Sequence, residues 1–196
     1  MGRHDAIRTP AFNGPAGWSV ILPPVPPRAR LEGQARCDIA IVGGGFAGLS
    51  AARRLHQIDP GLRVVILEAA RISEGGTGRN SGFMIDLPHE LTSGDYAGAG
   101  DSHDQQLTRL NRQAIAFAAG IVEEFAIPEG YFQRAGKING AASDAGVAAN
   151  ESYARHLRDL GEAHERLDAR AMREITGSAY YRDGLYTPGT VMIQPA

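Results

Sequence analysis

Cysteine is almost absent from this sequence, since Cys37 is the only one among 196 residues. A single cysteine excludes an internal disulfide and a cysteine-rich metal site, and it fits a reducing compartment. Cys37 stands at the start of an apolar run, which predicts a buried and unreactive thiol. The histidines are scattered without the spacing of metal ligands, so we expect no metal site.

Long apolar segments and a strong net charge are also missing. No stretch approaches the roughly 18 apolar residues that a membrane span requires, and the first residues lack the apolar core of a secretory signal. The formal net charge is -2 and the pI is about 6.3, which gives no sign of binding to nucleic acid or to an anionic membrane. We therefore expect a soluble, cytoplasmic protein with neither nucleic acid nor membrane as a partner.

Glycine, by contrast, is abundant, and its 25 residues are clustered. The first cluster lies within a series of apolar runs. Residues 38–42 predict a short strand, residues 45–58 a helix with one apolar face, and residues 62–67 a second strand. A strand, a helix and a strand within about thirty residues form a βαβ unit, which places the two strands parallel.

The turn between the first strand and the helix follows the pattern G-x-G-x-x-G, with Gly43, Gly45 and Gly48. In this pattern the first glycine permits the tight turn, the second lets a diphosphate approach the main chain, and the third lets the helix pack on the strands. Glu68 ends the second strand, where its carboxylate can accept hydrogen bonds from ribose hydroxyls and repels a ribose 2′-phosphate. The sequence therefore predicts an adenine-dinucleotide site.

A second glycine cluster, RISEGGTGRNSGF over residues 71–83, follows Glu68 closely. In a simple NAD-dependent dehydrogenase the chain usually turns quickly toward the next helix after the acid. A flexible loop rich in hydrogen-bonding groups suits a longer cofactor such as a flavin dinucleotide. This loop favours FAD, and an NAD-dependent dehydrogenase remains the alternative.

We divide the chain into four expected parts. They are an irregular, proline-rich extension (1–36), a cofactor-binding βαβ unit with its glycine-rich loop (37–95), a long amphipathic helix (96–130) and the beginning of a second domain (131–196). The apolar residues that recur at helical spacing in the third part are Leu107, Leu110, Ala114, Phe117, Ile121 and Phe125.

In the fourth part we expect an extended segment at 131–141 and a helix at 143–160. Asp168 is a candidate N-cap for a short helix that ends before Gly177, and residues 180–196 are typical of β structure.

The residues do not identify a catalytic group. Tyr180, Tyr181 and Tyr186 could approach a substrate pocket, although packing within a sheet is the preferred interpretation. Lys137 is the only lysine in the chain. It could face a flavin or an anionic substrate, and a plain surface charge is preferred.

Residues 37–55, 64–72 and 75–84 resemble the amino-terminal part of the FAD-dependent, D-amino-acid-oxidase-like superfamily, in particular its gamma-glutamylputrescine-oxidase-like branch. The resemblance implies an α/β fold: a Rossmann-like, FAD-binding βαβ unit of the glutathione-reductase type, followed by the start of an α+β substrate domain. It also implies FAD as cofactor and a small amine or amino acid as substrate. Substrate C–H would deliver a hydride to the flavin, and water would hydrolyse the resulting imine.

The resemblance also assigns roles to individual residues. It implies that the FAD pyrophosphate is cradled by Gly43, Gly44, Gly45, Phe46, Ala47 and Gly48. Glu68 would hold the adenosine ribose, and Ala69 and Arg71 would flank the adenine. The diphosphate and flavin side would be lined by Gly76, Thr77, Gly78, Arg79, Asn80 and Gly82. Thr77 stands where serine is commoner, a change that keeps the hydroxyl.

Members of this superfamily are usually much longer than 196 residues. We therefore expect a truncated chain that depends on a missing carboxyl-terminal half or on a second chain. Two parallel strands alone leave an unpaired edge, so we expect weak FAD binding and little turnover from this chain by itself. A non-catalytic remnant, or one subunit of a split flavoprotein, is a further alternative.

Overall fold

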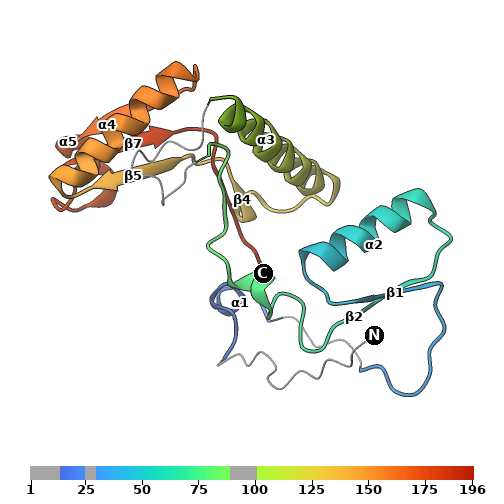
Figure 1. Cartoon of the computed structure of the whole chain (residues 1–196). Coiled ribbons are helices and arrows are strands. Elements are labelled where there is room, and N and C mark those ends of the chain that lie inside the picture. Colours follow the sequence, from blue (N-terminus) through green and yellow to red (C-terminus); the bar gives the residue numbers. More distant parts are fainter. Residues whose placement is uncertain (1–13, 25–29, 89–100) are drawn as a thin grey trace, which may run out of the picture. The chain divides into compact units, whose positions relative to one another are not determined.

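The structure is a computed structural model that describes residues 14–24, 30–88 and 101–196 (Figure 1). These residues divide into two compact units. The first contains the described residues up to Ser81 together with Pro195–Ala196, and the second is Gly82–Gln194. The expected boundary between residues 95 and 96 lies outside the described residues.

The first unit contains the predicted βαβ arrangement. Strand β1 (Ile39–Val42) pairs in parallel with β2 (Val64–Leu67), and helix α2 (Phe46–Ile58) connects them. Ile39 lies opposite Val64, so the apolar residues of the two strands are in register. Cys37, just before β1, is partly rather than fully buried.

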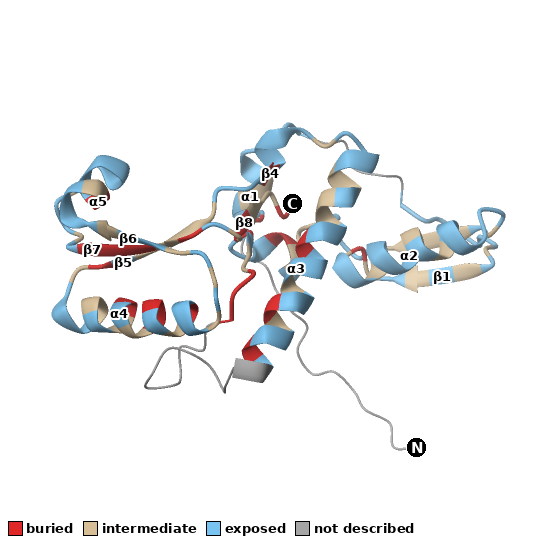
Figure 2. Ribbon diagram, turned by 90° about the horizontal axis from the view of Figure 1, so that it is seen from above, coloured by how far each residue is buried: buried red, intermediate tan, exposed pale blue. Residues whose placement is uncertain are grey.

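Little of this βαβ unit is buried. The sheet has two strands, and none of the residues of α2 is buried, so that the helix is tan and pale blue in Figure 2. Leu49, on the expected apolar face of the helix, remains 37% exposed, and Val42 at the end of β1 is 86% exposed. The apolar pattern predicted the elements correctly, but two strands are too few to cover the helix face that it defines.

The described part of the expected irregular extension contains a short helix, α1 (Gly17–Val20). It contacts the 3₁₀ helix η1 (Gly76–Arg79) of the glycine-rich loop. The indole Nε1 of Trp18 donates to the carbonyl oxygen of Asn80 at 2.8 Å. The extension is therefore anchored on the loop by the only tryptophan of the chain.

The second unit contains a three-stranded antiparallel sheet in the order β5-β7-β6, formed by Lys137–Ala141, Asp183–Thr187 and Glu165–Asp168. Helix α4 (Asp144–Asp159) covers one face and α5 (Ala169–Thr176) lies against the other, and the buried side of α4 faces β5 and β7 (Figure 2). The fully buried residues between α4 and the sheet form one core cluster: Leu87, Tyr153, Ala154, Leu157 and Leu185.

The ends of these two helices agree with the sequence. Ser143 caps α4 by accepting from the main-chain nitrogen of Gly146 at 3.2 Å, and Asp168 caps α5 by accepting from Ala171 at 2.8 Å. Gly177 ends α5 in the left-handed conformation, with φ of 70°, which is favourable for glycine. Strand β6 was not predicted, because Glu165–Asp168 has neither β-branched residues nor alternating polarity.

A second small sheet in this unit has the order β3-β8-β4. Its strands are Phe83–Met84, Val191–Ile193 and Phe132–Gln133, and β4 follows the 3₁₀ helix η2 (Glu129–Tyr131). Ile115 of the long helix α3 (Asp101–Glu124) is buried with Phe132 and Val191.

The side of α3 that is buried only partly agrees with the expected one, since Leu107 and Ile121 are half-buried. The buried stripe runs through Thr108 and Ile115. Of the residues that defined the expected apolar face, Leu110 is 50% exposed and Phe117 is 56% exposed, as is Phe125 beyond the helix end at 60%. Helix α3, over Asp101–Glu124, lies within the part of the chain expected to form the long helix.

Candidate functional site

The turn after β1 has the geometry that the glycine pattern predicts. Gly43 has φ of 103°, a conformation that side-chain-bearing residues rarely adopt. Its main-chain nitrogen donates to the carbonyl oxygen of Leu67 at 2.8 Å. The turn is therefore fixed to the end of β2, where the acidic residue follows.

Two glycines keep space that a side chain would fill. A Cβ atom added at Gly48 would lie 2.0 Å from the carbonyl oxygen of Gly43, so that glycine is required for the helix to begin this close to the strand. A Cβ added at Gly45 would lie 2.8 Å from Thr77 Oγ1. Gly45 is also the N-cap of α2 and has no side chain of its own with which to cap the helix.

The start of α2 has the electrostatics of an anion site. Its first turn contains no acidic residue, and Ala47 offers no side-chain group that could compete for the main-chain nitrogens. Main-chain N–H groups of a first helical turn and the positive end of the helix dipole favour a phosphate at such a position. The residues present therefore fit the diphosphate of a dinucleotide.

Glu68 joins the end of β2 to this turn. Its Oε2 accepts from the main-chain nitrogen of Gly44 at 2.7 Å, and its Oε1 accepts from Ala70 at 3.1 Å. Hydrogen bonds from Gly44, and then from Ala70, lower the pKa of the Glu68 carboxyl group. Each carboxylate oxygen has a second lone pair, so a ribose hydroxyl can still donate to it.

The glycine-rich loop closes over the first turn of α2. Thr77 Oγ1 accepts from the main-chain nitrogen of Phe46 at 3.2 Å, and Asn80 Nδ2 donates to the carbonyl oxygen of Thr77 at 2.5 Å. Gly78 is buried, and a Cβ there would lie 1.9 Å from the carbonyl oxygen of Ser73. Thr77 is thus a direct connection between the two glycine clusters.

Arg79 is held by the loop and by the amino-terminal segment. Its Nε donates to the carbonyl oxygen of Glu74 at 2.8 Å, and one terminal nitrogen donates to that of Gly14 at 2.7 Å. The Glu74 carboxylate accepts in turn from the main-chain nitrogen of Ala16 at 3.2 Å. Sequence reasoning did not assign Glu74 a role, and no pattern within the loop points to a partner 58 residues away.

Only some of the expected site residues of the first unit are connected to one another in the structure. Gly43, Gly44, Gly45, Phe46 and Gly48 are connected through hydrogen bonds and close packing to Glu68 and Thr77. Ala69, Arg71 and Gly76 are exposed at the margin of this group. Gly82 belongs to the second unit, where its carbonyl oxygen accepts from the main-chain nitrogen of Ile193 at 2.7 Å.

The described residues form neither a metal site nor a membrane-crossing helix. Within residues 14–24, 30–88 and 101–196, no group of three or more His, Cys, Asp or Glu side chains could hold a metal ion. In the same ranges, no helix has both the length and the apolar character needed to cross a bilayer.

A βαβ unit with this glycine turn, a first helical turn without acidic residues and an acid at the end of the second strand defines a dinucleotide-binding protein. Residues 38–196 match the sequence profile of the family described as "DAO: FAD dependent oxidoreductase". The chain belongs to this family of FAD-dependent oxidoreductases, which confirms the resemblance and favours FAD over the nicotinamide alternative.

Relatives with known names agree with this assignment. The chain is 32% identical to gamma-glutamylputrescine oxidoreductase of Escherichia coli (strain K12) over 76% of its own length and 34% of the relative. It is 26% identical to the probable oxidoreductase OrdL of Rhizobium meliloti (strain 1021), over 96% of its own length and 44% of the relative.

A solved structure supports the fold. Glycine oxidase from Geobacillus kaustophilus superimposes with a TM-score of 0.63 at 20% identity, over 83% of this chain and 42% of that one. The expected α/β fold class is thereby confirmed. The chain spans less than half the length of these relatives.

Proposed function

We propose that this chain supplies the FAD-binding part of an oxidoreductase that acts on a small amine or amino acid. The observation that carries the proposal is the hydrogen bond between Glu68 and Gly44 beside the start of α2, whose first turn contains no acidic residue. The names of the relatives, gamma-glutamylputrescine oxidoreductase and glycine oxidase, support the substrate class.

In this proposal FAD supplies the acceptor for a hydride from the substrate C–H next to the amine. The chain's own residues bind and orient the cofactor. The main chain of Gly43, Gly44, Gly45, Phe46, Ala47 and Gly48 receives the diphosphate, and Glu68 accepts from the ribose hydroxyls. The remaining contacts are assigned to Ala69 and Arg71 at the adenine and to Gly76, Thr77, Gly78, Arg79, Asn80 and Gly82 toward the flavin.

The test compares ligands that share parts of FAD. FAD, ADP, FMN, NAD⁺ and NADP⁺ are titrated into the full chain, with fluorescence polarisation for the flavins and calorimetry for the others. We expect FAD and ADP to bind more tightly than FMN, because the described contacts recognise the adenosine diphosphate half. NADP⁺ should bind more weakly than NAD⁺, since a 2′-phosphate meets the Glu68 carboxylate. Equal affinity for FMN and FAD contradicts the proposal.

Three variants make this test specific. Glu68→Ala removes the ribose acceptor, and Gly45→Val places a side chain where Thr77 Oγ1 lies 2.8 Å from the added Cβ, so both should weaken ADP binding at least tenfold. Gly75→Ala is the matched control in the same loop, because a Cβ there has no atom within 4 Å. Circular dichroism establishes that each variant is folded.

We further propose that tight FAD binding needs additional polypeptide of this family, either continuous with this chain or as a second chain. The exposed apolar residues around β1 and α2, Val42 at 86% and Phe46 at 54%, support this. We expect purified residues 1–196 to bind FAD weakly and to turn over amines slowly. A monomeric, cooperatively melting chain that carries stoichiometric flavin contradicts this second proposal alone.

We also propose a cytoplasmic location, which the single cysteine supports. Fractionation of the expressing cells tests it: recovery of the chain outside the cytoplasmic fraction contradicts the proposal.

A further inference from the structure

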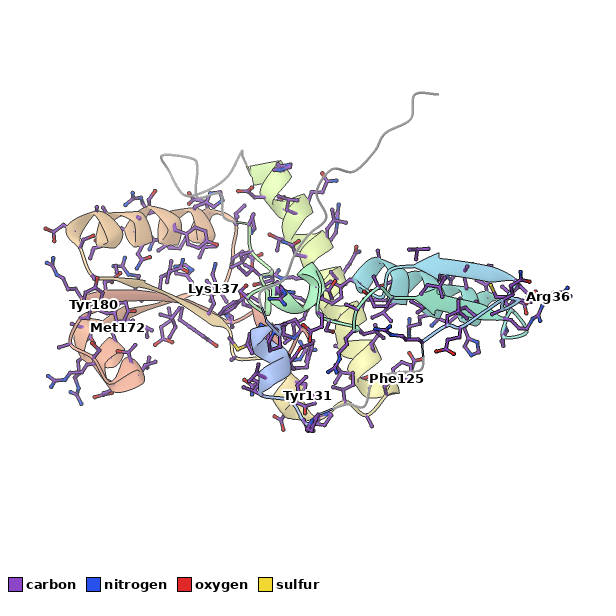
Figure 3. All side chains as sticks on the ribbon, turned by 90° about the horizontal axis from the view of Figure 1, so that it is seen from below. Arg36, Phe125, Tyr131, Lys137, Met172 and Tyr180 are labelled. Atoms are coloured by element: carbon purple, nitrogen blue, oxygen red, sulfur yellow. The ribbon has the colours of Figure 1, made fainter. Side chains whose placement is uncertain are left out.

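Polar side chains gather on one face of the antiparallel sheet of the second unit. Lys137 and Asn139 are two residues apart on β5 and therefore share a face. Thr187 of β7 pairs directly with Lys137, so its side chain lies on that face as well. Figure 3 labels Lys137 on β5 and Met172 near α5.

Two of these side chains contain buried polar atoms without partners. Thr187 is 0% exposed, and its Oγ1 makes no hydrogen bond to the described residues. The Nδ2 of Asn139 is also buried and without a partner among them. Because native proteins rarely leave buried donors unpaired, such a group indicates a position where a ligand or water completes the bonding.

Lys137 lacks a close counter-charge. Its Nζ lies 5.8 Å from the ring centroid of Tyr153, and no ion pair to Lys137 is formed within the described residues. Burial lowers the pKa of Lys137, and the charge of Asp86 partly opposes that shift. The Asp86 carboxylate is itself engaged by Arg112, whose nitrogen lies 3.1 Å from Oδ2.

Lys137 and Asn139 line a hollow of about 420 Å³, whereas Thr187 does not. Its lining consists of Phe83, Ile85, Ala135, Gly136, Lys137, Ile138 and Asn139. This volume is in the range of small-molecule sites, which combine apolar walls with a few polar groups. Here the walls are mainly apolar and main-chain, and Lys137 is the only ionisable side chain among the lining residues.

We propose that this hollow binds a small monocarboxylate, with Lys137 as its counter-ion and the Asn139 amide as a hydrogen-bond donor. One cation and one amide N–H match the single charge and two oxygens of a carboxylate. A dianion such as phosphate is disfavoured by the nearby Asp86. The existence of a carboxylate site is independent of the proposed function. Only the assignment of that carboxylate to an amino-acid substrate rests on the proposed function.

The only lysine of the chain makes a selective probe possible. Reductive methylation with ¹³C-formaldehyde labels Lys137 and the amino terminus alone. The full chain is titrated with sodium acetate, glycine, inorganic phosphate or sodium chloride at matched ionic strength. We expect acetate and glycine to shift the Lys137 methyl signal with saturation, while the amino-terminal signal stays fixed and chloride and phosphate have no saturable effect.

Variants separate a specific site from general attraction. Asn139→Leu should weaken acetate binding about tenfold, whereas Arg182→Gln, which removes an exposed cation of the same unit, should leave it unchanged. Acetate should raise the melting temperature of the native chain relative to chloride, and this increase should vanish in Lys137→Gln. If that variant does not fold, the Asn139→Leu titration still decides.

Several results overturn the proposal. They are a non-saturable shift, an equal response to chloride, or acetate affinity that Asn139→Leu does not change. Binding of acetate but not of glycine overturns the assignment to an amino acid. The Glu68→Ala chain, which tests the FAD proposal separately, should bind acetate with unchanged affinity.

Discussion

The Oε2 atom of Glu68 and the main-chain nitrogen of Gly44 lie 2.7 Å apart, and this hydrogen bond joins the segments that follow the carboxyl ends of β1 and β2. Because this bond stabilises the ionised carboxylate, it gives Glu68 both a structural and a binding role. The two roles can be separated by titration.

Glu68→Gln is expected to weaken FAD or ADP binding about tenfold and to unfold the first unit at slightly lower temperature. The pKa of Glu68 in the folded chain lies below its ordinary value of 4.5. The ionised carboxylate therefore contributes fully to stability above pH 4.5, and this contribution is lost as pH falls through the folded-state pKa. FAD affinity of the native chain should therefore be constant from about pH 8 to pH 5, because the diphosphate diester of FAD does not titrate in this range. Calorimetry at each pH measures it, and an inflection near neutral pH contradicts the assignment.

Gly48→Ala should destabilise the first unit by about 2 kcal/mol or more, because the added Cβ meets a main-chain oxygen that cannot move aside. The fluorescence of Trp18, which lies in α1 and bonds to the glycine-rich loop, can follow urea unfolding of this unit. Gly75→Ala, where a Cβ has open space, is the control and should change the midpoint little. Equal midpoints for the two variants would show that the close approach of α2 to the strand is not needed.

Asp38 and Arg63 form a two-point ion pair beside the sheet, with Oδ1 2.9 Å from a terminal nitrogen and Oδ2 3.2 Å from Nε. The hydrogen bonds from Arg63 lower the pKa of Asp38 to about 2. Its stabilising contribution should be present above about pH 4 and disappear as pH falls toward 2. In thermal melts, Asp38→Asn should remove this component of the acid sensitivity. Arg63→Gln should remove the same component, and the double variant should add nothing further.

Lys137→Met is expected to raise the melting temperature of the second unit by a few degrees, because it removes a partly buried cation that lacks a close partner. The lowered pKa of Lys137 means that the folded state disfavours the proton. Native stability should therefore rise as pH increases through the folded-state pKa toward 10.5, and the methionine variant should not show this rise. A lower melting temperature for Lys137→Met at neutral pH contradicts this account.

Asp86→Ala should destabilise the second unit by about 2–3 kcal/mol, because it removes a carboxylate that is 1% exposed and that pairs with Arg112. Glu162 bonds the same guanidinium at 2.6 Å from a more exposed position. Glu162→Gln should cost about 1 kcal/mol or less. Urea midpoints of the two variants measure the difference, and a larger loss for Glu162→Gln contradicts it.

The sequence predicted most of the elements around the cofactor site. Gly43 and Gly48 belong to a local pattern that nearly determines the turn, and the parallel pairing of β1 and β2 brings Glu68 to it. The partners of Arg79 were not predictable, because Gly14 and Glu74 are connected to it only through the folded loop. Proximity of that kind depends on tertiary packing rather than on periodicity.

Two other differences have a common physical cause. Helix α3 has more than one apolar stripe, and periodicity alone does not choose between Leu110 and Ile115 as the buried residue. Lys137 resembled a surface charge in the sequence, yet its environment depends on Tyr153 and Asp86, which other segments contribute. In both cases neighbouring segments determined the burial.

The placement of β8 between β3 and β4 constrains the order in which the second unit can form during synthesis. Phe83–Met84 and Phe132–Gln133 leave the ribosome long before Val191–Ile193, but neither strand has its hydrogen-bonding partner until that last strand emerges. The nascent chain must therefore keep both strands without this partner until Val191–Ile193 has been synthesised.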